Sequence, residues 1–395
     1  MKIIKIIFFL TLLVFFVNSQ VDPDVLANIT QLIHNHGYPC TNHKVTTEDG
    51  YILQVQHVPY GRNNASRTQD PKPVVYLQHG LLDSSFTWFL NEPNEALGYI
   101  LADYGFDVWA GNVRGNTMGL EHIKWTTNDV QFWNFSYDEM IQYDLPAIVD
   151  FILEETGSSE IYYVGHSQGG GMGLGALSIF PKYQEIFKSV ALLAPATYEN
   201  HQQCFLLSLL ADMEQKYFFD FFGEKDFMPE TWWIELVANT FCAADPIVCE
   251  DIILLIVGAD TGNLNESRLP VFLSHTPAGS STKNINHYLQ LIRTNKWQMY
   301  DYGTDGNMVK YGQSTPPEYP VENVLNPPIG FFFGSKDLLV TQKDWEQTLA
   351  RLSPDLQWTE YTVPDYDHLD YVWGVNAHTL LYPQVIQHLV SNTRK

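Results

Sequence analysis

The chain has 395 residues, 45% hydrophobic and 17% charged, which is enough to bury a large core and too apolar for a disordered protein. Its 45 acidic and 22 basic residues leave a formal net charge of −23, and a protein this negative repels nucleic acid, so we expect no DNA or RNA partner. The composition also excludes a collagen, a coiled coil and a polytopic membrane protein. The 23 Phe, 22 Tyr and 10 Trp provide a large amount of flat apolar surface, which favours an apolar ligand.

The first residues have the pattern of a secretory signal peptide. Lys2 and Lys5 precede the apolar run Ile6–Val17, which contains a single threonine, and the small residue Ser19 follows. This order predicts a signal peptide over residues 1–19. The alternative is a membrane anchor, which needs about 20 apolar residues, and no later stretch is long enough to span. We therefore expect the chain to enter the secretory pathway and to keep no transmembrane segment after the signal is removed.

Glycosylation motifs agree with a secretory route. We expect Asn64 to be accessible because it lies in a predicted polar loop, Gly61–Lys72. The motif at Asn134 is less favourable, because Ser136 also starts a helix capping box that ends at Glu139, and its hydroxyl would then be occupied. The candidate glycosylation sites with the Asn-X-Ser/Thr pattern are Asn28, Asn64, Asn134 and Asn265.

Strand and helix patterns alternate through the first half of the chain. The segments Lys44–Thr47 and Tyr51–Val55 flank Glu48-Asp49-Gly50, which predicts a hairpin with a glycine turn. A helix is expected from Asp144 to Thr156, and Gly157 is its stop signal. Strands separated by helices indicate a mostly parallel sheet with right-handed crossovers. The short buried strands that we expect are Val74–Gln78, Phe106–Ala110, Ile161–Val164 and Val190–Ala194.

The alternation stops in the middle of the chain and then returns. The region from about 197 to 320 is rich in aromatic clusters and holds two of the four cysteines close together, Cys242 and Cys249. The strand pattern resumes at Ile329–Phe333 and Trp358–Val363. An insertion between sheet strands explains this most simply. We therefore expect one α/β core made of residues 20–196 and 321–395, interrupted by an inserted domain over residues 197–320.

A strand, the pentapeptide Gly165-His-Ser-Gln-Gly169 and a glycine-rich helix start follow one another directly. This is the pattern of a nucleophile elbow, in which glycines allow a sharp turn and the serine hydroxyl is exposed at a helix N-terminus. The alternative is a glycine turn that only packs a helix onto a strand. We interpret Ser167 as a catalytic nucleophile, because two further features of the chain fit that role.

The first feature is the loop that follows the strand Val74–Gln78. Acyl transfer places negative charge on the carbonyl oxygen, and fixed backbone N–H groups aimed at that oxygen stabilise it by several kcal/mol. The N–H of Gln168 is expected to be one donor, and the N–H of Leu81 or Leu82 the other. We interpret His79 and His166 as structural histidines that brace these loops.

The second feature is the order of the acid and the base. A serine nucleophile needs a histidine to remove its proton and a carboxylate to hold the imidazole. Asp337 follows the strand Ile329–Phe333, and His368 follows the strand Trp358–Val363, which is the order Ser, Asp, His of the α/β-hydrolase fold. The competing acids in the last loop, which we expect to cap or solvate it, are Asp365, Asp367 and Asp370.

A series of motifs follows one another along the same chain. In order they are Tyr51-Ile-Leu, Leu77-Gln-His-Gly-Leu-Leu82, Asp107-Val-Trp, Gly111-Asn-Val-Arg-Gly-Asn116, Tyr143-Asp-Leu-Pro146, Gly165-His-Ser-Gln-Gly169, Gly334-Ser-Lys-Asp-Leu338 and Asp367-His-Leu-Asp370. Together they resemble the acid lipase family, to which gastric lipase and lysosomal acid lipase belong. The resemblance extends from Gly37-Tyr-Pro39 to the C-terminus.

The resemblance implies an α/β-hydrolase core with a largely helical cap between its strands. On the matching positions it implies the triad Ser167, Asp337 and His368, and it chooses Leu81 beside Gln168 as the oxyanion donors. It implies a lipase that hydrolyses triacylglycerols or steryl esters at a lipid–water interface, with no metal and no cofactor, in the secreted or lysosomal compartment. The chain departs from the family pattern in the spacing of the cysteines in the insertion.

Two alternatives to a lipase remain from the sequence. One is an esterase of the same fold that acts on small soluble esters, and the other is a lipid carrier built on an inactive hydrolase scaffold. The complete triad argues against the carrier, because lipid carriage does not require these three residues together. The sequence makes no prediction about oligomeric state.

The cysteines generate a prediction about the insertion. Cys242 and Cys249 are seven positions apart, and the other two cysteines are Cys40 and Cys204; their spacing fits neither a zinc site nor a CxxC redox pair. We expect a disulfide between Cys242 and Cys249 that stabilises the cap by about 2 kcal/mol through loop closure. Peptide mapping checks the bond, and mild reduction should lower activity on emulsified lipid more than on a short soluble ester. Unpaired cysteines, or an equal loss on both substrates, would contradict the prediction.

Overall fold

The computed structural model describes residues 22–68, 71–228 and 261–393. The predicted signal peptide and the proposed Cys242–Cys249 pair lie outside these residues. Across the described ranges, no helix combines the length and the apolar character needed to cross a membrane.

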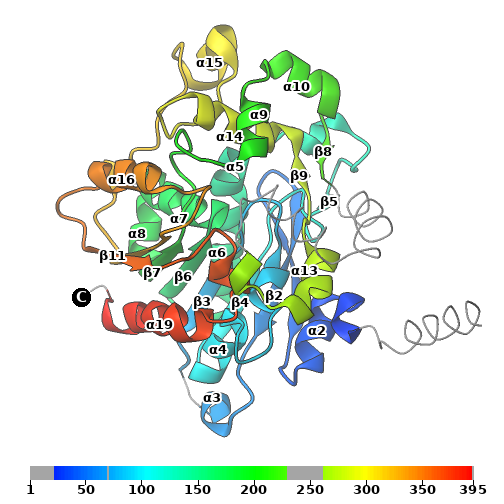
Figure 1. The fold of residues 1–395 in the computed structure, drawn as a ribbon, viewed down its shortest axis with the longest axis vertical. Helices are drawn as coiled ribbons and strands as arrows, with labels where there is room; N and C mark the ends of the chain where they lie inside the picture. Colours follow the sequence, from blue (N-terminus) through cyan, green and yellow to red (C-terminus); the bar gives the residue numbers. More distant parts are fainter. Residues whose placement is uncertain (1–21, 69–70, 229–260, 394–395) are drawn as a thin grey trace, which may run out of the picture.

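The described strands form one large mixed sheet and a small two-stranded sheet (Figure 1). The strands are β1 (Thr41–Thr46), β2 (Tyr51–Val58), β3 (Val74–Gln78), β4 (Asp107–Gly111), β5 (Glu121–His122), β6 (Ile161–His166), β7 (Phe187–Leu193), β8 (Asp226–Phe227), β9 (Ser280–Ser281), β10 (Ile329–Gly334) and β11 (Trp358–Val363). In the large sheet their order is β1-β2-β4-β3-β6-β7-β10-β11, with β5 added to β2. All neighbours from β4 to β11 are parallel, whereas β1–β2 and β2–β4 are antiparallel.

The strand predictions are confirmed, because the buried apolar runs are strands. Every residue of β3, β6 and β10 is buried, as expected for central parallel strands covered on both faces. The predicted hairpin is β1–β2, and its turn glycine, Gly50, has a φ of 104°, which a side chain would oppose. Two predicted segments, Val74–Gln78 and Trp358–Val363, agree with β3 and β11 at both ends.

Helices flank the large sheet (Figure 1). The helices outside the predicted insertion are α2 (Ile29–Asn35), α3 (Asn64–Thr68), α4 (Leu97–Tyr104), α5 (Tyr137–Glu139), α6 (Leu145–Thr156), α7 (Gln168–Ile179), α8 (Pro181–Ile186), α16 (Gln342–Arg351), α17 (Asp370–Trp373), α18 (Ala377–Leu380) and α19 (Tyr382–Ser391). Helix α4 packs on β4, α7 on β6 and β7, and α19 on β7. Helix α6 ends before Gly157, which is left-handed with a φ of 66°, as the sequence predicts.

The segment between β7 and β10 is mainly helical where it is described. Its elements, besides the short strands β8 and β9, are α9 (Phe205–Ala211), α10 (Gln215–Phe222), α13 (Leu269–His275), α14 (Thr282–Arg293) and α15 (Gly303–Tyr311). Helices α9, α10, α14 and α15 gather at the top of the molecule in Figure 1. This arrangement agrees with a cap, whose limits at residues 197 and 320 remain a prediction.

The aromatic residues of this segment divide between packing and exposure. The ring of Phe218 is fully buried and contacts Phe222, which in turn contacts Phe227. By contrast, Phe205 is 71% exposed and Phe221 is 76% exposed. Trp232 and Trp233, which the sequence places in the same cluster, lie outside the described residues.

The N-terminal segment is bonded to the inserted segment. Arg268, which is 3% exposed, contacts the carboxylates of Asp22 and Asp24 at 2.9 Å each. The Nε2 atom of His275 lies 2.9 Å from the backbone oxygen of Asp24. These contacts join two parts of the chain that are about 250 residues apart in sequence. The bonds of Arg268 are charge-assisted, which makes them stronger than neutral hydrogen bonds.

The predicted modification sites lie on different local structures. Asn28 is the exposed N-cap of α2, and its amide oxygen accepts a hydrogen bond from the N–H of Gln31. Asn64 begins α3, so the prediction of a polar loop throughout residues 61–72 is wrong in part: a short helix forms there. Asn134 is exposed, and the capping box predicted at Ser136 and Glu139 is present. Asn265 is half-buried. Glycosylation itself remains a prediction.

Cys40 is a buried free thiol at the start of β1. Burial raises the pKa of this thiol to about 11, so the sulfur is held in its unreactive protonated form.

A buried arginine connects two of the sequence motifs. Arg114 is 1% exposed, and its Nε donates to Asp144 at 2.8 Å while its two terminal nitrogens donate to Asp49 at 2.6 and 2.8 Å. The guanidinium also lies 4.0 Å from the ring centroid of Tyr51. Asp144 immediately precedes α6, so this network joins the β1–β2 turn, the loop after β4 and the start of α6.

We predict that Arg114→Met lowers the free energy of unfolding by about 3–5 kcal/mol at neutral pH, because Asp144 then becomes an unpaired buried charge. Burial already raises the pKa of Asp144 to about 6 against the opposing effect of Arg114. Without the arginine this pKa rises further, so the carboxyl is neutral at acid pH and the loss of stability should be smaller there. Urea unfolding at about pH 5 and pH 8 measures both effects.

The matched control is Lys44→Met. Lys44 pairs with Glu121 at 2.6 Å, but both side chains are more than half exposed, so we expect little change in stability at either pH. A loss for Arg114→Met as small as that of Lys44→Met, or one independent of pH, would contradict the prediction.

Candidate active site

Ser167 occupies a strained turn between β6 and α7. It has a φ of 53° and a ψ of −119°, and such a backbone conformation in a non-glycine residue is typical of functional sites. Both flanking positions require glycine, because a side chain there would overlap backbone atoms. A Cβ on Gly169 would overlap the carbonyl oxygen of Gln78, and a Cβ on Gly165 would overlap the carbonyl oxygen of Gly169. The predicted elbow is therefore the geometry that these residues adopt.

The three residues predicted as a triad lie together in hydrogen-bond contact. The Oγ atom of Ser167 is 2.8 Å from Nε2 of His368, and Nδ1 of His368 is 2.9 Å from a carboxylate oxygen of Asp337. Because a carboxylate only accepts, Nδ1 carries the proton and Nε2 is free to accept from the serine hydroxyl. The other oxygen of Asp337 accepts from the N–H groups of Leu339 and Val340 at 2.9 Å each, which holds the carboxylate in place.

The competing acids have other partners, as the sequence predicts. Asp365 is exposed and pairs with Lys336 at 3.2 Å. Asp367 accepts from the N–H of Leu369 at 2.8 Å, and Asp370 accepts from the N–H of Asp367 at 2.9 Å. The carboxylates of Asp367 and Asp370 thus cap the loop that carries His368.

The two histidines interpreted as structural are buried and neutral. His79 donates from Nδ1 to the carbonyl of Gly80 at 2.8 Å, and burial lowers its pKa to about 4. His166 contacts the carbonyl oxygen of His368 through Nε2 at 2.9 Å. Burial, together with the nearby His368, lowers the pKa of His166. His79 thus braces the loop after β3, and His166 braces the loop of the catalytic histidine candidate.

The loop after β3 passes directly over the elbow. A Cβ on Gly80 would lie 3.0 Å from Cβ of Ser167, so the backbone of this loop lies as close to the serine as packing allows. Leu82 has a φ of 58°, and its carbonyl accepts from the N–H of Ala278 at 2.6 Å. Gln168 is the first residue of α7, where N–H groups have no partner within the helix. Both predicted oxyanion segments are therefore adjacent to the hydroxyl of Ser167.

The side chain of Gln168 is held by α14 from the inserted segment, a contact that the sequence did not predict. Its amide oxygen accepts from Nδ2 of Asn284 at 2.9 Å and from the hydroxyl of Tyr288 at 3.3 Å. The N–H of Asn284 is in turn capped by the hydroxyl of Ser281 at 2.9 Å.

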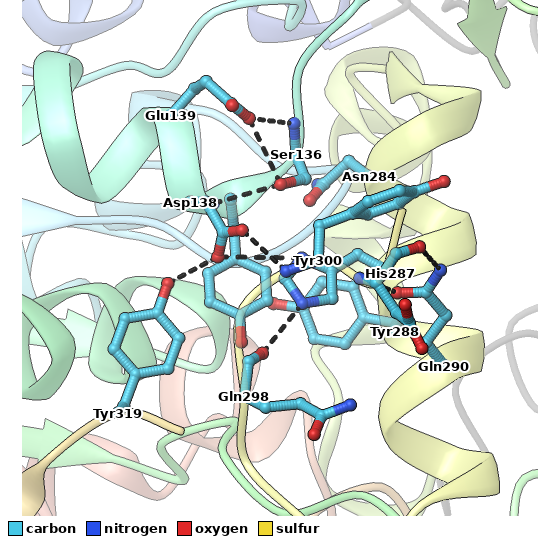
Figure 2. Close-up of polar contacts among 12 residues, drawn as sticks. Ser136, Asp138, Glu139, Asn284, His287, Tyr288, Gln290, Gln298, Tyr300 and Tyr319 are labelled. Carbon is cyan, nitrogen blue, oxygen red and sulfur yellow. Dashed lines mark hydrogen bonds and ion pairs between the residues drawn. The ribbon is translucent and has the colours of Figure 1, made fainter. Parts of the chain in front are cut away.

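Helix α14 is itself anchored by a buried polar cluster around His287 and Asp138 (Figure 2). The His287 ring stacks on Tyr137 with 4.4 Å between centroids, and its Nε2 donates to the carbonyl of Gln298 at 2.9 Å. Asp138 accepts from the hydroxyl of Tyr319 at 2.5 Å and lies 3.9 Å from Nδ1 of His287. Burial raises the pKa of Asp138 and lowers that of His287.

A cavity of about 170 Å³ opens beside Ser167. Its wall is mainly apolar and includes Leu206, Leu210, Ile285, Leu339 and Trp373. Two buried carboxyl groups also line it, those of Asp83 and Glu199.

The sequence did not identify these two acids as site residues. Burial raises the pKa of Asp83 to about 7. Burial, together with the charges of Asp344 and Asp337, raises the pKa of Glu199. Each acid lies shortly after the carboxyl end of a central strand, β3 or β7, which is the same signal that identified Asp337.

Within the part of the chain that the structure describes, no group of three or more His, Cys, Asp or Glu side chains is arranged to hold a metal ion.

The sequence matches two family models. The model described as a partial α/β-hydrolase lipase region matches residues 29–92, and the model for the α/β-hydrolase fold matches residues 73–228. Among solved structures, carboxylesterase CesB from Bacillus subtilis is similar, with a TM-score of 0.51 at 13% identity over 91% of this chain and 95% of that chain. At this identity the likeness shows the fold alone, which is the predicted α/β-hydrolase fold.

Two human proteins are similar over nearly the whole chain. Gastric triacylglycerol lipase from Homo sapiens is 40% identical over 376 residues, which cover 94% of this chain and 93% of that protein. Lysosomal acid lipase/cholesteryl ester hydrolase from Homo sapiens is 39% identical over 374 residues, which cover 93% and 92%. With this identity and coverage, on an α/β-hydrolase fold, the chain belongs to the acid lipase family and is a carboxylic ester hydrolase.

Proposed function

We propose that this protein is a serine lipase that hydrolyses the ester bonds of neutral lipids, triacylglycerols or steryl esters, through an acyl-enzyme. The observation that carries the proposal is the hydrogen-bonded series from Ser167 through His368 to Asp337 at the edge of an apolar cavity. The names of the two human relatives, a triacylglycerol lipase and a cholesteryl ester hydrolase, support this substrate class.

In the first step Oγ of Ser167 attacks the ester carbonyl while Nε2 of His368 takes the hydroxyl proton. Asp337 keeps the imidazole in the required tautomer and stabilises the imidazolium. The N–H groups of Leu81 and Gln168 bind the oxyanion that forms. These two donors remain a proposal, which the position of both segments beside Ser167 supports.

In the second step His368 returns the proton to the oxygen of the leaving alcohol, and the fatty acid stays bound to Ser167 as an ester. Water then attacks this acyl-enzyme, His368 accepts a proton from the water, and the fatty acid leaves as the serine hydroxyl is restored. Apart from the ester and water, the proposed scheme uses side chains and backbone groups of this chain and requires no metal or cofactor.

The exposed apolar side chains of α9 and α10 support action at a lipid–water interface. Phe205 is 71% exposed, Leu209 is 53% exposed and Phe221 is 76% exposed. Phe205 and Leu209 are one helical turn apart on α9, and exposed apolar groups of this kind are typical of surfaces that contact lipid or protein. We propose that the enzyme works in secretions or in the lysosomal lumen, as the signal peptide pattern and the family indicate.

We predict that Ser167→Ala abolishes ester hydrolysis and labelling by a fluorophosphonate probe without loss of stability. His368→Ala and Asp337→Asn should each lower kcat by about 10⁴-fold, because the proton acceptor or its correct tautomer is lost. The measurement is hydrolysis of an emulsified triacylglycerol and of a dissolved short-chain ester by each variant.

The matched control is Asp365→Asn, an exposed acid of the neighbouring loop, which should keep full activity. Near-full activity of Asp337→Asn would place the catalytic acid elsewhere. Labelling of Ser167 without activity on the emulsion, but with activity on the dissolved ester, would favour an esterase. No labelling at all would favour a lipid carrier.

We predict an activity maximum on emulsified lipid below about pH 7. The isoelectric point is near 4.8, so the net charge falls toward zero at acid pH and repulsion from anionic lipid surfaces weakens. The opposing requirement is a neutral imidazole on His368, which must accept the proton of the serine hydroxyl. A pH profile measured on a neutral dissolved ester is the control and should lie at higher pH than the emulsion profile. A maximum above neutral pH on the emulsion would contradict the prediction.

A further inference from the structure

Glu199 is a buried acid in the cavity of the active site that the proposed mechanism does not use. It is 5% exposed, it lies in the loop after β7, and it lines the cavity together with Ser167 and His368. Among the described residues its carboxyl group has no hydrogen-bond partner, although its backbone oxygen accepts from the N–H of Gln202. A carboxyl group that lines a binding cavity and has no hydrogen bond to another described side chain is placed to bond a polar group of a ligand.

The surroundings of Glu199 favour the neutral form of its carboxyl group by raising its pKa. Burial is the main cause of its raised pKa, and the charges of Asp344 and Asp337 add to it. No basic side chain of the described residues contributes to this shift. Tyr288 of α14 lies in the same region. Burial raises the pKa of its hydroxyl, and the ionised form of Glu199 would raise it further. The titratable groups that face Glu199 or share its cavity are Asp83, Tyr137, His166, Tyr288, Asp337, Asp344 and His368.

The sheet order places Glu199 and the loop after β3 on opposite sides of Ser167. The loop with Gly80 and Leu81 follows β3, on one side of β6, which carries Ser167. Glu199 follows β7, on the other side of β6. The scissile carbonyl oxygen is bound on the β3 side in the proposed mechanism, so Glu199 faces a different part of the bound ester.

We propose that the carboxyl group of Glu199 donates a hydrogen bond to an oxygen atom of the bound lipid other than the scissile carbonyl oxygen, and that this bond favours glycerides over lipids with a single ester group. A glyceride carries further ester oxygens close to the scissile bond, whereas a steryl or methyl ester leaves the carboxyl group unpaired in the cavity. A site built to hydrogen-bond a substrate group discriminates against substrates that lack it. The inference rests on the proposed lipase function and names the substrate preference of the same site.

The test compares Glu199→Leu and Glu199→Gln with the unchanged enzyme on trioleoylglycerol, cholesteryl oleate and methyl oleate in one emulsion. All three substrates contain the same oleoyl chain. The ratio of their kcat/KM values therefore reports only on the alcohol part of the ester. Leucine removes the donor, so we expect about a tenfold loss of kcat/KM on trioleoylglycerol and a less than about twofold change on the two single esters. Glutamine keeps a donor of similar shape and serves as the matched control, with a ratio close to that of the unchanged enzyme.

The pH dependence of the ratio separates a binding role from a structural one. An ionised carboxylate cannot donate, so the preference of the unchanged enzyme for trioleoylglycerol should decrease as the pH rises through the pKa of Glu199. In Glu199→Gln the ratio should stay constant from about pH 5 to pH 9, because the amide does not titrate. Unfolding temperatures of both variants show whether they fold.

Two results would overturn the inference: an equal loss on all three esters in Glu199→Leu, or a ratio that is independent of pH in the unchanged enzyme. Hydrolysis of methyl oleate by the unchanged enzyme with no change of ratio in either variant would reject the role of Glu199 and leave the proposed lipase function intact. If the unchanged enzyme hydrolyses none of the three esters, the proposed function itself fails.

Discussion

The close approach of the first turn of α7 to the end of β3 determines the geometry of the whole site. Gly169 lies so near the carbonyl oxygen of Gln78 that a side chain there would overlap it. The loop after β3 also passes close to Ser167, since a Cβ on Gly80 would lie 3.0 Å from Cβ of the serine. The positive φ of Ser167 is stabilised by the packing around it, since an isolated chain would avoid that conformation.

The inserted segment is part of this geometry and not only a cover for it. Asn284 and Tyr288 reach from α14 to the side chain of Gln168, whose backbone N–H belongs to the proposed oxyanion site. Helix α14 is fixed by His287 and its stacking on Tyr137, which lies in the core part of the chain. Movement of α14 away from the core would break buried hydrogen bonds on both sides, and such bonds are costly to leave unmade.

Local patterns in the sequence were sufficient for the longer sheet strands, for α6 and for the residues brought together at Ser167, but not for the two-residue strands β5, β8 and β9. Strand β3 and the elbow could be predicted because each depends on residues that are neighbours in sequence. Asp337 and His368 could be predicted because the carboxyl ends of parallel strands lie at one edge of the sheet. The helix at Asn64–Thr68 was missed because its polar residues show no apolar periodicity.

The contacts of Gln168 with α14 and the burial of Glu199 could not be predicted in the same way. They depend on tertiary contacts between segments that are more than 100 residues apart in sequence, and no local sequence pattern predicts such contacts. The burial of Arg114 with Asp144, which are only 30 residues apart, also depends on tertiary packing, although both residues stand in motifs that the sequence does reveal.

The ties between the inserted segment and the rest of the chain have a consequence for protein engineering. Exchanging the region between β7 and β10 for that of a relative, in order to alter selectivity, also exchanges Arg268, the partner of Asp24 near the N-terminus, and Asn284, the partner of Gln168. A chimera that replaces only this region leaves buried carboxylates and an amide facing foreign side chains. Successful grafts should therefore carry a second, N-terminal piece of the donor protein, so that the unit of exchange is discontinuous in sequence.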